Sequence, residues 1–160
     1  MNQNRILRPH GKKFSDYYIF SAAVLLFVTA AAKLFAAAGT GAPLNDSDPV
    51  FQLSNRQVFW LAGGLELGLS AFLLMKEGWP GVKLMLIAWL ATGFLLYRAG
   101  LWFLGAPSLC VCLGNLNAQF PLSPRFTNVI MLVGLTWLLA GSGLLLLRDR
   151  PGRAPVRSRR

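Results

Sequence analysis

Apolar residues in this chain are gathered into four long runs, which are separated by segments rich in polar residues, glycine and proline. A bilayer core about 30 Å thick is crossed by about 20 consecutive, mostly apolar residues in a helix. The second run is the shortest, and it crosses the core if its helix stands nearly upright. The pattern predicts an all-α fold, an integral membrane antiparallel four-helix bundle with helices over residues 17–38, 58–75, 84–104 and 126–147.

The composition and the placement of charge agree with a membrane protein. Hydrophobic residues make up 54% of the chain, too many for an ordinary soluble domain. The net charge of +10 would suit nucleic-acid binding, but the basic residues are concentrated at the two ends of the chain. Basic chain termini stay cytoplasmic and attract anionic lipid. We therefore expect the lipid bilayer to be a partner of this protein, and we expect no binding of nucleic acid. The basic residues at the two ends of the chain are Arg5, Arg8, Lys12, Lys13, Arg148, Arg150, Arg153, Arg157, Arg159 and Arg160.

The segments between the runs indicate which side of the membrane each one faces. The second segment carries Lys76 and Lys83, whereas the first and third carry a single arginine each, Arg56 and Arg125. Short segments rich in Lys and Arg remain cytoplasmic. We therefore expect a plasma (inner) membrane protein of bacteria with both termini cytoplasmic and the first and third loops outside.

This reading divides the chain into a basic cytoplasmic lead (1–16), a membrane domain (17–147) and a basic cytoplasmic tail (148–160). Within the membrane domain, residues 105–125 form the expected extracytoplasmic loop. A cleaved signal peptide is the alternative for the first run, because basic, apolar and small-residue regions follow one another there. The length of the run and Lys33, near the would-be cleavage site, argue against it. Cleavage would leave the sidedness of the other loops unchanged.

Glycine and proline suggest how the helices pack. Gly64 and Gly68 are four residues apart and form a small-xxx-small face that lets another helix approach closely. Trp79, Pro80 and Gly81 predict a tight inner turn, so the second and third helices are expected to pair as an antiparallel hairpin.

Two carboxylates, Asp46 and Asp48, stand in the first loop among other turn-forming residues. They suggest either a cation site or caps of a turn. The second role is the more common one for Asp in such surroundings.

The two cysteines of the chain, Cys110 and Cys112, stand two positions apart in the third loop. Helical positions i and i+2 lie about 200° apart, so Pro107 and Gly114 on either side place the pair in irregular backbone. A disulfide in so small a ring adds little loop entropy and is hard to form without strain. Strained, accessible disulfides exchange readily, which favours a catalytic redox pair over a structural or inert one. Two thiolates cannot complete a tetrahedral metal site, and His10 is expected on the opposite side, so we expect no metal.

Three charged residues, Lys33, Glu66 and Arg98, fall inside the apolar runs at similar depth in the outer half of the membrane. Charges in lipid are costly, so we expect them to face the bundle interior, with Glu66 neutralising Lys33 or Arg98. The cluster is either a packing element, or it tunes the thiols or binds an anionic or quinone-like headgroup. Aromatic residues either line such a quinone pocket or form the interfacial belt; these are Trp60, Trp89, Tyr97, Trp102 and Trp137.

Three of these features together resemble the DoxX-like superfamily. They are Ala-Ala-Lys33-Leu, the stretch from Gly63 to Gly68 with Glu66 inside it, and Cys110-Val-Cys112-Leu-Gly114. Within that superfamily, the chain resembles the methylamine-utilisation MauE-type proteins over residues 17–147. The resemblance implies that the protein supports disulfide formation in, or maturation of, a periplasmic partner enzyme. Val111 and Leu113 depart from the glycine and the aromatic residue that are frequent there, and no second cysteine pair is present.

The leading hypothesis is therefore a redox-associated membrane protein, in the class of thiol-disulfide oxidoreductases if it is an enzyme. Its partner would be an exported thioredoxin-like protein or a client being matured, and a quinone is the candidate electron acceptor. One alternative is a non-catalytic assembly or accessory subunit of a membrane complex. The other is transport of protons or small molecules along Lys33, Glu66 and Arg98.

Overall fold

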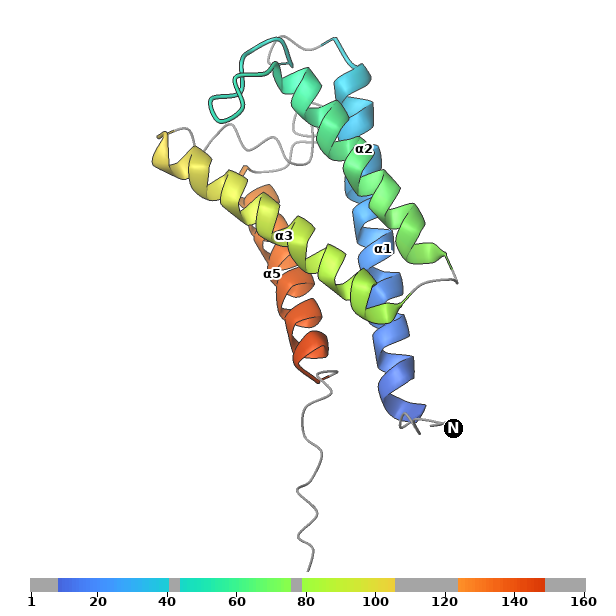
Figure 1. Ribbon diagram of the computed structural model, residues 1–160. Coiled ribbons are helices and arrows are strands. Elements are labelled where there is room, and N and C mark those ends of the chain that lie inside the picture. The colour runs from blue at the N-terminus through green and yellow to red at the C-terminus, as the bar shows by residue number, and fades with distance from the viewer. Residues whose placement is uncertain (1–8, 41–43, 76–78, 106–123, 149–160) are drawn as a thin grey trace, which may run out of the picture.

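A computed structural model describes residues 9–40, 44–75, 79–105 and 124–148 (Figure 1). Four helices occupy these ranges, and all four are long and apolar enough to cross a membrane. The predicted all-α membrane bundle is thereby confirmed. The helices are α1 (Pro9–Ala38), α2 (Asn55–Leu74), α3 (Pro80–Phe103) and α5 (Pro124–Arg148).

All four helices begin before the predicted positions, α5 by only two residues. α1 begins at Pro9, so part of the expected basic lead is helical. α2 begins at Asn55 because Ser54 and Gln57 form a capping box: the Gln57 amide donates to Ser54 Oγ at 3.3 Å and the Ser54 amide donates to Gln57 Oε1 at 3.1 Å. α3 begins at Pro80, because proline is favoured in the first helical turn, where its missing N–H costs nothing. The predicted turn at Pro80 is therefore the start of a helix.

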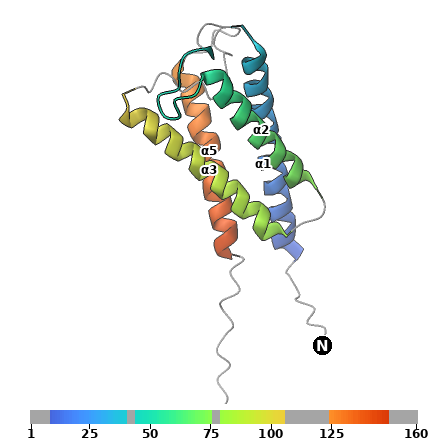
Figure 2. The ribbon, with the colours of Figure 1, turned by 45° about the horizontal axis from the view of Figure 1, so that its top comes forward.

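The helices run alternately up and down, and they associate as two pairs (Figures 1 and 2). α1 packs along α2, and α3 packs along α5. The predicted close hairpin of α2 and α3 is wrong, because the backbones of these helices lie apart. Leu65 and Trp89 line a cavity between the two helices. The first loop, the end of α3 and the start of α5 all lie at one end of the bundle.

Gly63, and not the predicted Gly64 and Gly68 face, allows α1 and α2 to approach each other. A Cβ atom at Gly63 would lie 3.0 Å from side-chain atoms of Leu34 on α1. A Cβ at Gly64 or Gly68 would meet no atom within 4 Å. The small-xxx-small face is therefore not used between the described helices of this chain.

Lys83 has a role in the fold that the sequence did not reveal. The residue is buried in the first turn of α3, and its Nζ donates to the carbonyl oxygens of Leu73, at 3.0 Å, and Met75, at 2.5 Å. Carbonyls at the C-terminal end of a helix lack helical partners, and a cation there also complements the helix dipole. Lys83 thus caps α2 from α3 instead of standing free at the membrane surface.

Tyr18 and Gly141 form the contact between α1 and α5. The buried Tyr18 hydroxyl donates to the Leu138 carbonyl at 2.6 Å, which fixes its ring where a Cβ of residue 141 would lie. We expect Gly141→Ala to lower the free energy of unfolding by about 1–3 kcal/mol through overpacking. Gly143 has open space beside it, so Gly143→Ala is the control. This substitution should raise the free energy of unfolding by up to about 1 kcal/mol. Denaturant unfolding in detergent micelles measures both, and equal stability of the two variants would contradict this packing.

Candidate functional site

Lys33 and Glu66 form an ion pair in the interior of the bundle. Lys33 Nζ lies 2.5 Å from Glu66 Oε1, and the two side chains are only 3% and 2% exposed. Thr29, one helical turn before Lys33 on the same face of α1, donates to Glu66 Oε2 at 3.0 Å. Both carboxylate oxygens therefore have a partner, as a charge buried within a membrane span requires.

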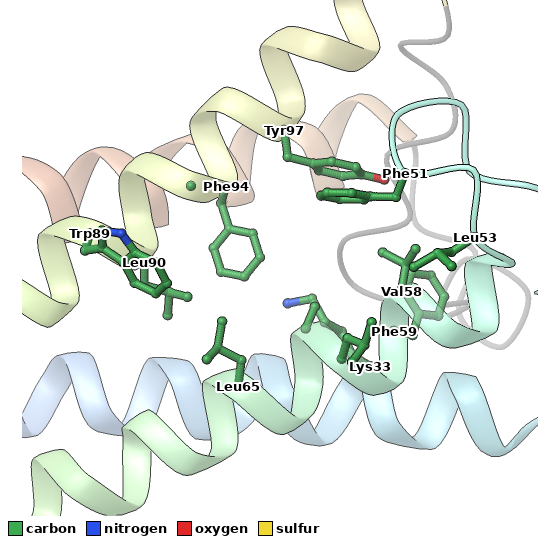
Figure 3. A pocket seen from close by; sticks show the side chains of 13 residues that line it. Lys33, Phe51, Leu53, Val58, Phe59, Leu65, Trp89, Leu90, Phe94 and Tyr97 are labelled. Carbon is green, nitrogen blue, oxygen red and sulfur yellow. The ribbon is translucent and has the colours of Figure 1, made fainter.

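The third helix completes the surroundings of this pair. Lys33 Nζ lies 5.0 Å from the centre of the Phe94 ring of α3, a cation–π contact. Figure 3 shows the nitrogen of Lys33 directed into the space below Phe94. A lysine ammonium carries three donors, and Glu66 accepts from Lys33 by one oxygen. The remaining donor capacity therefore faces the gap between the two helix pairs.

That gap contains a cavity of about 300 Å³ between α2 and α3. Lys33 is the one charged residue among the described residues that line it, and the other walls are almost entirely apolar. Leu61 and Leu65 of α2 and Trp89 of α3 line the cavity and are also 64%, 49% and 65% exposed. All three lie within helices that could span the membrane. The cavity therefore opens sideways, toward the hydrocarbon core.

The first loop bounds the cavity at one end. Phe51 stacks on Tyr97 of α3, with ring centres 5.4 Å apart and planes 9° apart, and both line the cavity. Asp48 is 2% exposed; its Oδ1 accepts from the amides of Val50 and Phe51, each at 2.9 Å, and its Oδ2 accepts from the Tyr97 hydroxyl. In the described structure Asp48 is the cap of a turn, and it also ties the first loop to α3.

Of the three predicted charges, Lys33 and Glu66 pair in the structure. Arg98 is half-buried on α3, has interactions of its own, and is not among the described residues that line the cavity. Sequence reasoning missed Thr29 and Phe94. Thr29 could have been found from its spacing of four residues from Lys33, which places both side chains on one face of a helix. Nothing in the sequence pointed to Phe94.

The aromatic residues singled out in the sequence fall into two groups. Trp89 and Tyr97 line the cavity. Trp60 and Trp102 are exposed and do not line it, and Trp137 packs against Tyr18 with ring centres 6.0 Å apart. The second group suits the interfacial belt or helix packing better than a binding site.

Cys110 and Cys112 lie outside the described residues, so their geometry stays a prediction. The chain places them between the end of α3 and the start of α5. Both of these helix ends lie at the end of the bundle where Asp48 and the first loop are found (Figures 1 and 2). Among the described residues there is no group of three side chains that could hold a metal ion.

The described site thus offers a cationic hydrogen-bond donor, neutralised by its carboxylate partner, in an apolar cavity that is open to the bilayer. No protein-family model, no curated protein and no solved structure matches this chain.

Proposed function

We propose that this chain is a redox-associated protein of the bacterial inner membrane that supports disulfide exchange with, or maturation of, an exported partner. The observation that carries the proposal is the pair Cys110 and Cys112, two positions apart in the segment that joins α3 to α5. The resemblance of this motif, and of the stretches around Lys33 and Glu66, to MauE-type proteins adds support.

Charge and helix topology support the sidedness that the proposal requires. α1 begins and α5 ends at the end of the bundle opposite the first loop, and most of the basic residues of the chain lie near or beyond those two helix termini. Lys- and Arg-rich ends are retained in the cytoplasm. The segment that contains the cysteines then faces the periplasm, where disulfides form and persist.

The chemistry is ordinary thiol–disulfide exchange. In the reducing direction, the thiolate of one cysteine attacks a disulfide of the partner and forms a mixed disulfide, and one partner thiolate leaves. The second cysteine attacks the mixed disulfide and releases the reduced partner, while Cys110 and Cys112 become the disulfide. The reverse sequence oxidises the partner. The exported thioredoxin-like or client protein supplies a disulfide in the reducing direction and a dithiol in the oxidising direction.

Alkylation trapping in intact cells tests the proposal. We expect the pair to change oxidation state together with the partner, and a Cys110→Ser or Cys112→Ser variant to accumulate a mixed disulfide. The double variant should reduce partner maturation to background, whereas Val111→Ala, which keeps both thiols, should support it. Normal maturation with the double variant would refute the exchange role. Labelling by an impermeant maleimide only in broken cells, after mild reduction, would refute the sidedness.

A second candidate is a non-catalytic accessory subunit of a membrane complex. It is favoured by the open space beside Gly64 and Gly68, because such a face suits close packing against a helix of another chain. A stoichiometric partner that co-purifies equally well with the double cysteine variant would support this candidate over disulfide exchange.

A further inference from the structure

We infer that the cavity between α2 and α3 binds the headgroup of a quinone drawn from the bilayer, with Lys33 donating a hydrogen bond to a quinone carbonyl oxygen. This inference deepens the proposed function and rests on it, since it names the electron acceptor for the thiols. The charge, the walls and the opening of the cavity support it.

The charge of the site favours a neutral ligand with a hydrogen-bond acceptor. Lys33 and Glu66 neutralise each other at 2.5 Å, so a bound phosphate or carboxylate would introduce an unbalanced negative charge into apolar surroundings. A carbonyl oxygen adds no net charge. It needs one donor, and the ammonium of Lys33 has donors beyond the one that Glu66 occupies.

The walls and the size of the cavity suit a ring. Its volume of about 300 Å³ is at the lower limit for small-molecule sites, enough for a headgroup but not for a complete lipid. Phe94 and Trp89 offer aromatic faces on the α3 side, and the stacked Phe51 and Tyr97 lie at the loop end (Figure 3). Planar rings stack favourably on such side chains.

The lateral opening suits the tail of the same molecule. Leu61 and Leu65 line the cavity and are 64% and 49% exposed along α2, within a span that is apolar enough to cross the membrane. An isoprenoid chain attached to the ring can therefore leave the cavity through apolar surroundings. In the reaction, oxidation of Cys110 and Cys112 to a disulfide releases two electrons and two protons, and the quinone takes up both to become a hydroquinone.

The test uses the full chain in nanodiscs of zwitterionic lipid, titrated with decylubiquinone while tryptophan fluorescence is recorded. We expect saturable quenching, because Trp89 lines the cavity. Gly93→Leu should weaken saturable binding at least tenfold, since Gly93 lines the cavity and has free space for a side chain that would fill it. Gly143→Leu is the matched control: it is also a helical glycine with open space, away from the cavity, and should bind as the wild type does.

A second variant tests the hydrogen-bond donor. Lys33→Met/Glu66→Met removes the donor without leaving an unpaired charge, and it should also weaken binding at least tenfold. Unchanged affinity in Gly93→Leu would overturn the inference. So would displacement of the quinone by phosphatidylglycerol at equal mole fraction, which would assign the cavity to an anionic lipid headgroup.

The cysteines separate this inference from the proposed function. The Cys110→Ser/Cys112→Ser variant should bind decylubiquinone with unchanged affinity, because it keeps Lys33, Trp89 and Phe94, the lining residues that are proposed to hold the ring. Saturable quinone binding without any disulfide exchange would refute the proposed function and leave the binding site standing. Disulfide exchange by a wild-type protein that shows no saturable binding would refute the site alone.

Discussion

Lys33→Met is expected to lower the free energy of unfolding by about 3–5 kcal/mol, because it leaves the Glu66 carboxylate buried without its cation. Glu66→Met should cost a similar amount by stranding Lys33. Both side chains are less than 5% exposed, so neither can recover solvation without movement of the helices. Unfolding in mixed detergent micelles, followed by circular dichroism, measures the change.

The double variant Lys33→Met/Glu66→Met separates an ion pair from ordinary packing. We expect it to recover most of the loss, since two apolar side chains of similar length leave no charge to bury. Thr29 loses its acceptor on Glu66, but its single hydroxyl hydrogen can then be donated to the Leu26 carbonyl alone, 3.1 Å away. If the loss of unfolding free energy in the double variant equalled the sum of the losses in the two single variants, the two charges would not interact.

Asp48→Ala is expected to cost about 2–5 kcal/mol, because one carboxylate serves two backbone amides and the Tyr97 hydroxyl. The first loop should then separate from α3, and the amides of Val50 and Phe51 should exchange hydrogen faster. Unfolding in micelles gives the free energy, and hydrogen exchange locates the change.

Two variants control this prediction. Asp46→Ala removes an exposed carboxylate from the same loop and should stay within about 0.5 kcal/mol of the wild type. Asp48→Asn retains an oxygen that can accept from the backbone amides, so it should lower the free energy of unfolding less than Asp48→Ala does. If Asp46→Ala proved as costly as Asp48→Ala, the loss would reflect the loop's charge and not the bonds of Asp48.

The sequence was informative wherever the bilayer constrains it. Four helices followed from the apolar runs, because a spanning segment must satisfy its backbone internally. The contact of Lys33 with Glu66 followed from similar depth and the cost of unpaired charge, but depth alone did not distinguish Lys33 from Arg98 as the partner. The Ser54–Gln57 capping box was readable in the sequence, and it would have corrected the start of α2.

The arrangement of the helices was not readable. Helices in lipid are apolar on packed and exposed faces alike, so hydropathy does not show which face meets a neighbour. Gly63 and Gly64 are adjacent and chemically identical, yet only Gly63 faces α1. Phe94 and the space between α2 and α3 depend on that arrangement, and the cavity therefore emerged only from the structure.

The gap between the two helix pairs has a consequence for the route by which the proposed ligand would reach the cavity. A molecule that enters past Leu61 and Leu65 comes from the hydrocarbon core, without crossing water. Loading is then governed by lateral diffusion within one leaflet. Occupancy follows the mole fraction of the molecule among the lipids and is insensitive to its total concentration in the suspension, so diluting the vesicles at fixed composition leaves it unchanged.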